Sequence, residues 1–202
     1  MIGNDIVDLR DADAQPGARH PRFDARVFCA AELAALAASS APNRLRWVFW
    51  AAKEAAYKVA RKLDAASVFS PSQFAVELES EPVGVVAFGP ERLPFRVTEV
   101  PGGVHVVATH LSARRSRILM GSRELTDAAS RDVAAPGLAV RELALSQLSS
   151  CWPDSPGLAV AQEGRIPVLE SGGVRLDADL SLSHHGRWVA FACEIPQAAG
   201  LA

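Results

Sequence analysis

The chain of 202 residues has only three cysteines, and they lie far apart. Cys29, Cys151 and Cys193 are odd in number and form no CxxC pair, so we predict neither a disulfide framework nor a cysteine zinc site. No apolar run approaches the roughly 20 residues that a membrane helix needs. The first ten residues carry acids where an export signal would have a basic segment and then an apolar one. These absences predict a reduced, cytoplasmic protein with no membrane partner.

A strong charge of one sign is also missing, since the formal net charge is −2. Lys and Arg form no dense block, which argues against a nucleic-acid partner. Smaller basic groups suit a phosphate ligand or an acidic protein surface, although most exposed charges are simply solvated. These groups are Arg19, Arg22 and Arg26; Arg44 and Arg46; Lys58 to Lys62; and Arg114, Arg115 and Arg117.

The hydrophobic fraction of 49% is that of an ordinary globular protein. Apolar periodicity and turn residues predict strands at 2–9, 74–78, 83–88, 95–100 and 104–109, with helices at 26–38 and 44–63. After a basic connector at 114–117, we predict a helix at 140–149 and strands at 158–161, 167–169, 180–183 and 188–194. The fold class is therefore α+β. We expect two similar halves, 1–112 and 113–202, related by a pseudo-two-fold axis, each with an antiparallel sheet packed on helices.

The predicted helix at 44–63 carries a glutamate, Glu54, in a stretch that is otherwise almost wholly apolar. Glu54 and Lys58 are four residues apart and share one helix face with Tyr57. One interpretation is an ordinary surface pair that contributes about 0.2 to 0.5 kcal/mol. The other is a functional site, because a buried carboxylate is costly unless a cation or a metal compensates it.

Asp5 lies inside the predicted first strand, where carboxylates are disfavoured. Its ordinary interpretation is a turn-capping or edge-strand residue. Mg²⁺, however, is typically held by one or two protein carboxylates together with phosphates and water. If the strand packs on the helix, Asp5 and Glu54 come together, and without a cation they raise each other's pKa. The pair would then suffice for a magnesium site.

Two later segments also carry polar side chains. Ser183 and His184 could bind a phosphate, act as nucleophile and base, or simply belong to a surface turn. The nucleophile interpretation has poor geometry, because neighbours on a strand point to opposite faces and no GxSxG elbow surrounds the serine. The turn at Gly164–Pro167 presents Arg165, whose guanidinium suits phosphate oxygens.

Together these segments resemble the 4′-phosphopantetheinyl transferase superfamily. The resemblance lies in GNDIVDL at 3–9, Phe28 to Glu32, WAAKEAAYK at 50–58, GRIP at 164–167 and SLSHHGRWVAFA at 181–192. It implies an enzyme that moves the phosphopantetheine arm of coenzyme A onto a serine of an apo acyl or peptidyl carrier protein, needs Mg²⁺ and releases adenosine 3′,5′-bisphosphate.

The same resemblance implies roles for individual residues. It assigns Asp5 and Glu54 to the metal and Lys58 to the phosphates, with Glu54 and Lys58 as the catalytic residues. It assigns coenzyme A binding to Lys58 together with Arg165, Ser183 and His184. A second acid is common in this family two residues after the first, but Val7 stands there and Asp8 follows, so we expect water as the third ligand. Ile166 is inserted between Arg165 and the proline.

The motif order is similar to that of the acyl-carrier-protein-synthase type, which has one unit and trimerises. The length is similar to that of the surfactin-synthetase type, which fuses two units and places the serine–histidine hairpin first. We therefore expect the two halves of the longer type in permuted order, in a monomeric pseudo-dimer whose cleft between the halves holds the site. Permutation is permissible where chain ends lie close together.

Several alternatives stay open. The base that deprotonates the carrier serine is Glu54 or a metal-bound water. A basic rim of Arg22, Arg26, Arg44 and Arg46 could dock an acidic carrier, of fatty acid, polyketide or peptide biosynthesis. The protein could instead be a non-catalytic regulatory relative that binds coenzyme A or a carrier. Other magnesium-dependent chemistry on a nucleotide finds no support, because a Walker-type loop is missing.

Overall fold

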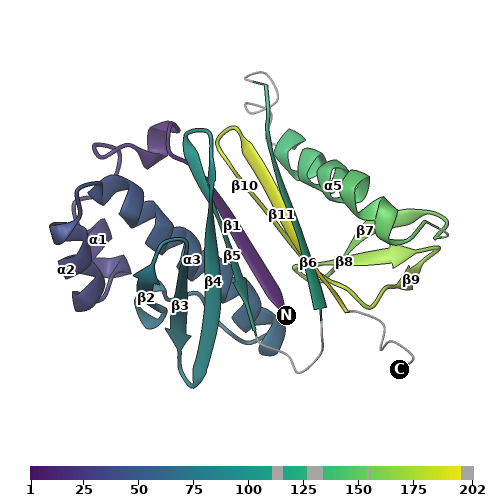
Figure 1. The fold of residues 1–202 in the computed structure, drawn as a ribbon, viewed down its shortest axis with the longest axis horizontal. Coiled ribbons are helices and arrows are strands. Elements are labelled where there is room, and N and C mark those ends of the chain that lie inside the picture. Colours follow the sequence, from purple (N-terminus) through teal and green to yellow (C-terminus); the bar gives the residue numbers. More distant parts are fainter. Residues whose placement is uncertain (111–115, 127–133, 154, 197–202) are drawn as a thin grey trace.

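The computed structural model describes residues 1–110, 116–126, 134–153 and 155–196, and its fold is α+β. Two groups of antiparallel strands stand side by side, each with a long helix packed against it (Figure 1). The predicted fold class is thus confirmed. The two groups meet in the middle of the molecule, where the first strand, β1, lies beside the hairpin formed by the last two strands, β10 and β11.

The first group is a five-stranded antiparallel sheet in the order β1-β5-β4-β3-β2. Helix α3 lies against β1 and β5 and buries its apolar side there, including Val48, Ala55 and Val59. The elements are β1 (Ile2–Asp8), η1 (Ala12–Ala14), α1 (Phe23–Val27), α2 (Ala30–Ala38), α3 (Pro42–Leu63), η2 (Pro71–Gln73), β2 (Ala75–Ser80), β3 (Val83–Phe88), β4 (Glu91–Val100) and β5 (Gly103–Thr109).

The second group has a three-stranded sheet in the order β10-β11-β6 and a smaller one in the order β7-β8-β9. Helix α5 covers the larger sheet, and Val140, Leu143 and Phe191 share its core. The elements are β6 (Ser116–Glu124), α5 (Ala135–Leu148), η3 (Ser149–Cys151), β7 (Leu158–Glu163), β8 (Ile166–Ser171), β9 (Val174–Arg175), β10 (Asp179–His185) and β11 (Trp188–Pro196).

Three predictions about elements were wrong. The helix expected at 26–38 is two helices, because α2 starts anew at Cys29, whose N–H donates to the Glu32 carboxylate at 2.8 Å in a capping box. The basic connector expected at 114–117 instead runs into β6 at Ser116, while 114–115 and the boundary at 112/113 lie outside the described residues. Helix α5 begins at Ala135, five residues before the predicted start at Val140.

The two groups are joined along what we call the seam, the contact between β1 and β10. Both strands are sheet edges there, and they run in the same direction with a constant offset of 177 residues. Side chains of β10 accept the outward N–H groups of β1: Ile2 N to Asp179 Oδ2 at 2.6 Å, Asn4 N to Ser181 Oγ at 2.9 Å and Asp8 N to His185 Nδ1 at 3.2 Å. The seam thus satisfies an edge that would otherwise expose unpaired N–H groups.

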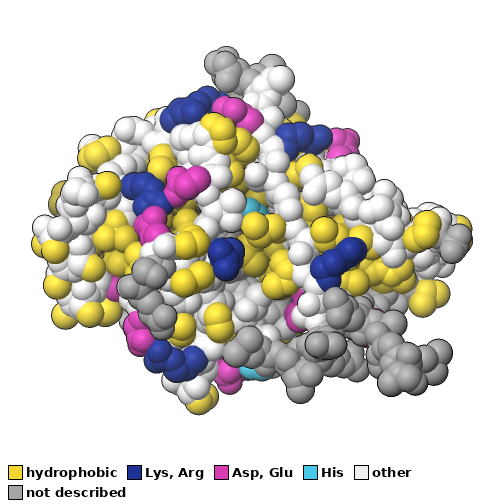
Figure 2. Space-filling model, in the orientation of Figure 1, with side chains coloured by type: hydrophobic (Ala, Val, Ile, Leu, Met, Phe, Trp, Pro, Cys, Tyr) yellow, Lys and Arg dark blue, Asp and Glu magenta, His cyan; other side chains and the backbone are white. Residues whose placement is uncertain are grey.

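Away from the seam, the surface shown in Figure 2 is mixed in character. Lys and Arg are scattered over this face, and hydrophobic side chains gather between the two groups of strands. An apolar groove of about 540 Å³ lies there, with Phe95 and Val107 on one wall and Met120 on the other. No helix among the described residues is long and apolar enough to cross a membrane.

Candidate functional site

The site begins with the close approach of β1 to α3. A Cβ on Gly3 would lie 2.0 Å from the carbonyl oxygen of Ala55, so only glycine fits at this position. Gly3, Asp5 and Val7 lie on one face of β1, which packs on the helix, and the residues between them lie on the other face, which is buried as well. The contact at Gly3 brings the Asp5 carboxylate against the part of α3 that carries Glu54 and Lys58.

Asp5 and Glu54 form a pair of crowded carboxylates. Burial raises the pKa of Asp5, and Lys58 only partly opposes that change. Burial, followed by the negative charge of Asp5, raises the pKa of Glu54 to about 7, again opposed by Lys58. Two carboxylates that disfavour each other's charge favour a cation between them. Their hard oxygen atoms suit Mg²⁺ rather than a softer metal.

Lys58 joins this pair to the second group of strands. Its Nζ donates to the carbonyl of Asn4 at 2.7 Å, to the carboxylate of Asp5 at 3.3 Å and to the carbonyl of Leu182 at 3.3 Å. The side chain is 29% exposed, whereas that of Asp5 is 15% exposed. Lys58 therefore balances part of the negative charge at the pair while it keeps one open side toward solvent.

A cleft of about 280 Å³ lies over these residues, between the two groups of strands. Glu54, Lys58 and Arg61 line one wall from α3, and Arg165 with Leu182 lines the other. Arg165 is exposed at the tip of the β7–β8 turn, which Gly164 closes with a φ of +60°. The structure thus brings the predicted Glu54, Lys58 and Arg165 together, and it leaves Ile166 as the first residue of β8.

Ser183 and His184 lie on opposite sides of β10. The Ser183 hydroxyl is buried and accepts a hydrogen bond from the Asn4 amide at 3.1 Å. His184 is exposed, and burial of part of its ring, followed by the positive charge of Lys58, lowers its pKa, while Asp5 opposes the change. His184 is therefore near the pair and open to solvent, whereas Ser183 is enclosed within the seam.

Lys53, the first residue of the KEA motif, is not in the cleft. It is fully buried and forms an ion pair of 2.8 Å with Glu32, which is also fully buried. Its ammonium additionally donates to the carbonyls of Pro71 and Phe74, and Glu32 accepts the N–H of Val76 at 2.7 Å. The glutamate of the FxxxE segment and the lysine of the KEA segment thus hold α2, α3 and β2 together.

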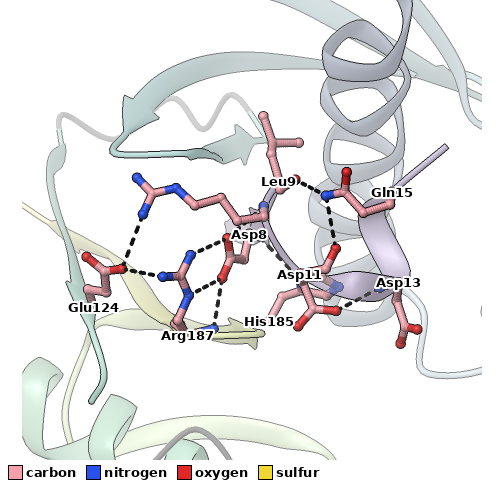
Figure 3. A network of polar contacts seen from close by, with 9 residues as sticks. Asp8, Leu9, Asp11, Asp13, Gln15, Glu124, His185 and Arg187 are labelled. Atoms are coloured by element: carbon pink, nitrogen blue, oxygen red, sulfur yellow. Dashed lines mark hydrogen bonds and ion pairs between the residues drawn. The ribbon is translucent and has the colours of Figure 1, made fainter. Parts of the chain in front are cut away.

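Asp8 is likewise committed to the fold (Figure 3). Its carboxylate is fully buried and accepts from Arg187 through Nε at 3.0 Å, Nη2 at 3.2 Å and the backbone N–H at 3.2 Å. Burial alone would raise the pKa of Asp8, but the hydrogen bonds from Arg187 and Arg10 outweigh it, and the net pKa is lowered. Arg187 also reaches Glu124 at 3.2 Å. This network ties the β10–β11 turn to the end of β1.

Reasoning from the sequence missed the polar residues of the seam. His105 is buried and its Nε2 lies 3.1 Å from the Asn4 amide nitrogen. Lys62 and Asp179 form an ion pair of 2.7 Å at the start of the seam. A lysine one turn after Lys58 and an aspartate at the start of the SLSHH strand were visible signals, but only the fold shows that they meet.

The predicted basic rim is only partly free. Arg46 forms a two-pronged ion pair with Asp24, with both bonds at 2.8 Å. Arg44 pairs with Glu81 and Glu99. Arg22 and Arg26 are exposed. The positive charge available to a carrier therefore lies chiefly at the start and end of α1 rather than on α3.

Within the described ranges, no group of three or more His, Cys, Asp or Glu side chains is placed to hold a metal ion. The site has two carboxylates instead, with basic residues around them. Such a donor set is incomplete until a phosphate ligand and water add their oxygens. The arrangement defines a class: a protein with a buried acidic pair beside a cleft that is lined by basic side chains.

Comparison with known families agrees with this class. Residues 1–109 match the family model described as the 4′-phosphopantetheinyl transferase superfamily, and the match ends with β5. The chain belongs to this superfamily, and its activity is in general terms the transfer of phosphopantetheine. No curated protein and no solved structure matches the chain.

Proposed function

We propose that this protein transfers the 4′-phosphopantetheine group of coenzyme A to a serine of an apo acyl or peptidyl carrier protein, as a holo-acyl-carrier-protein synthase. The observation that carries the proposal is the cleft where Glu54 and Lys58 face Arg165 across the two groups of strands. Acidic and basic groups facing one another there suit a metal together with a pyrophosphate.

Asp5 and Glu54 fit Mg²⁺, because burial raises the pKa of both carboxylates, the charge of Asp5 raises that of Glu54 further, and Lys58 offsets these effects only in part. Bound Mg²⁺ would neutralise charge on the pyrophosphate of coenzyme A. Arg165 lines the cleft and His184 lies near Lys58 and Asp5, so both can bind phosphate oxygens, and Lys58 can exchange its contact with Asp5 for one with a phosphate. Ser183 supports this site from within the seam by holding Asn4.

In the proposed reaction the Oγ of the carrier serine attacks the phosphorus nearest to pantetheine. The bond between that phosphorus and the bridging oxygen breaks, and adenosine 3′,5′-bisphosphate leaves with the bond's electron pair. The serine proton passes to a base. The chain's residues position the two reactants and stabilise negative charge on the leaving phosphate, which is the main contribution of a protein to phosphoryl transfer.

The carrier would approach near α1, where Arg22 and Arg26 are exposed on either side of Phe23. Phe23 packs on Trp50, whose ring centroid lies 5.6 Å away, and Trp50 is one turn before Glu54 on α3. An acidic carrier helix that docks at α1 would thereby bring its serine toward Glu54. Complementary charge mainly affects the rate of such an encounter.

Mass spectrometry tests the proposal. An apo carrier protein incubated with this protein, coenzyme A and Mg²⁺ should gain the mass of one phosphopantetheine group. The reaction should stop when the metal is chelated and resume when Mg²⁺ is restored. A carrier that stays unmodified, although it binds, would support the non-catalytic regulatory relative instead.

Glu54→Gln makes the test specific to the acidic pair. It keeps the shape of the side chain but removes one of the two carboxylates, so transfer should fall by about 10³-fold or more. Glu163→Gln is the matched control, because Glu163 forms an exposed ion pair with Arg175 on β9. Full activity of the Glu54→Gln protein would refute the metal assignment.

A further inference from the structure

The three lysines of the chain, Lys53, Lys58 and Lys62, all lie on α3. Lys62 is nearly covered, with 7% of its side chain exposed. Its Nζ donates to the carbonyl of Ile2 at 2.7 Å, the carbonyl of Leu180 at 2.8 Å and the carboxylate of Asp179 at 2.7 Å. An ammonium has three donors, so Lys62 has none left for a substrate.

Asp179 completes this contact from the other side. Its Oδ1 accepts from Lys62, while its Oδ2 accepts the backbone N–H of Ile2 at 2.6 Å. One carboxylate on β10 therefore binds both β1 and α3. Lys58 repeats the pattern one turn earlier with Asn4 and Leu182; both lysines line the cleft, but Lys58 is the more exposed of the two.

These contacts matter because few other hydrogen bonds can hold β1 beside β10. Among the described residues, no main-chain hydrogen bond joins β1 to β10, and the strands are linked through side chains alone. Lys58 and Lys62 each bridge a carbonyl of β1 to a carbonyl of β10, in place of the ladder that two neighbouring strands normally form. The relative position of the two strands is thus set by a few side chains.

We propose that Lys62 and Asp179 are positioning residues for the transfer reaction. They hold β10 in register beside β1 and so fix the position of Arg165 and His184 relative to Asp5 and Glu54. The catalytic consequence rests on the proposed function, whereas the structural one does not. Lys62 touches no substrate in this role, and it acts through the seam.

Asp179→Asn tests the pair with little change of shape. An amide can accept through one atom only, so it must lose either Lys62 or the N–H of Ile2. We expect the seam to open more often by about tenfold, since hydrogen bonds to charged groups are among the stronger ones. The readout is the rate at which an amine-acetylating reagent modifies each lysine, measured by mass spectrometry of peptides.

The lysines provide their own control. Lys62 should be acetylated about tenfold faster in the Asp179→Asn protein, while the fully buried Lys53 keeps its rate, because the core of the first group of strands stays closed. In Glu163→Gln, which breaks an exposed pair of the second group, neither rate should change. An unchanged rate at Lys62, or a parallel rise at Lys53, would overturn the proposal.

The kinetic readout separates positioning from loss of structure. Coenzyme A bound across the two groups needs a closed seam, so its KM should rise only by the factor by which the closed fraction falls, at most about twofold while the seam stays mostly closed, and kcat should stay within about twofold. A fall in kcat with unchanged KM would contradict this role. If neither protein transfers phosphopantetheine, the proposed function fails, but the acetylation rates still decide whether the pair holds the seam.

Should the Asp179→Asn protein not fold, Ser181→Ala carries the same test. This substitution removes the Ser181 hydroxyl, which accepts the N–H of Asn4 at the next contact along the seam. The acetylation of Lys62 should then accelerate about threefold, as expected for one neutral hydrogen bond. A rate equal to that of the unaltered protein would again overturn the proposal.

Discussion

Gly3 shows how one residue sets the geometry of the acidic pair. The carbonyl of Ala55 occupies the space that any side chain at position 3 would need. Gly3→Ala should therefore lower the free energy of unfolding by about 1 to 3 kcal/mol, or more, because β1 must move away from α3. Urea unfolding measures the change.

Gly17→Ala is the control for this substitution, since a Cβ at position 17 meets no atom within 4 Å. It should leave the free energy of unfolding within about 0.5 kcal/mol of the original. Transfer activity should fall with Gly3→Ala even at urea concentrations where the protein is folded. Equal stability of the two variants would show that α3 can adjust to a side chain at position 3.

Some single residues of the site could be predicted from the sequence, and others could not. Glu54 could be singled out because a carboxylate in an apolar helix is costly, and its pKa of about 7 agrees with that reasoning. Asp5 and Asp8 could not be separated in this way, since both are acids in one short strand. Arg187, 179 residues further on, neutralises Asp8, whereas Asp5 is left beside Lys58.

At the scale of elements, the buried pair of Lys53 and Glu32 joins α3 to α2. Lys53→Met removes one charge and leaves the other buried without its partner, which should cost about 3 to 5 kcal/mol in the free energy of unfolding. The exposed Arg175→Met, whose pair with Glu163 lies in water, should cost less than about 1 kcal/mol. Denaturant unfolding of the two variants gives the comparison.

This prediction also distinguishes two roles within one motif. Because Lys53 lies outside the cleft, any Lys53→Met protein that remains folded should keep its kcat. A large loss of kcat with unchanged stability would mean that Lys53 acts on the substrate. Lys53 would then have to be counted as a catalytic residue together with Glu54.

The elements that could be predicted are those with clear periodicity. Helix α3 was expected at 44–63 and spans Pro42–Leu63, and β3 was expected and found at 83–88. Strand β6 was missed because it does not alternate polar and apolar residues in the usual way: Ile118 and Met120 are exposed, while Arg123 shares with Leu119 the face toward α5. Its pairing partner lies some 70 residues away, and no local pattern reveals such a pairing.

The cleft could be predicted in its parts but not in its assembly. Glu54, Lys58 and Arg165 were each expected at a site, and α3 with the β7–β8 turn brings them together. The seam residues Lys62, Asp179, Asn4 and His105 were not expected, because each is an ordinary polar residue until the fold pairs it. Burial of Ser183 in the same contact was also beyond the reach of the sequence.

At the scale of the whole molecule, His105 links stability to pH. Burial, followed by the charge of Lys58, lowers its pKa from 6.5 to about 4, so the folded protein favours the neutral ring. Its contribution is complete above pH 6.5 and is lost as the pH falls toward 4. Over that range the free energy of unfolding should fall by about 2 to 3 kcal/mol more than in His105→Gln.

Denaturant unfolding at several pH values checks this difference. Asp5 and Glu54 have raised pKa values and give a slope of the opposite sign, but both proteins keep them, so the comparison removes their effect. Parallel curves for His105→Gln and the original would mean that the ring is not held neutral. The interior between the two groups of strands would then be better solvated than the fold indicates.

The order of the two groups can be tested directly. The α-amino group of Met1 lies 2.7 Å from the Glu194 carboxylate, so the start of β1 and the end of β11 are neighbours. Each group also pairs its first strand with its last, β1 with β5 and β6 with β11. We propose that the halves 1–112 and 113–202 are the two units of the longer family type in permuted order.

A rearranged chain, 113–202 followed by 1–112 with a short flexible linker, should fold and transfer phosphopantetheine at a rate within about tenfold of the original. A second rearrangement that opens the chain between Pro101 and Gly102, inside the β4–β5 hairpin, should lose stability because it cuts a paired turn. Circular dichroism and the carrier assay compare the two. Similar behaviour of both chains would contradict the proposed boundary.

The seam has a consequence for how proteins of this family assemble. A first half on its own would present the amides of Ile2, Asn4 and Asp8 along a bare strand edge, and such an edge attracts another strand. A neighbouring copy could satisfy it with the same kinds of side chain that β10 supplies here. If the proposed halves are two units, the second unit protects the edge of the first from pairing with a strand of another molecule.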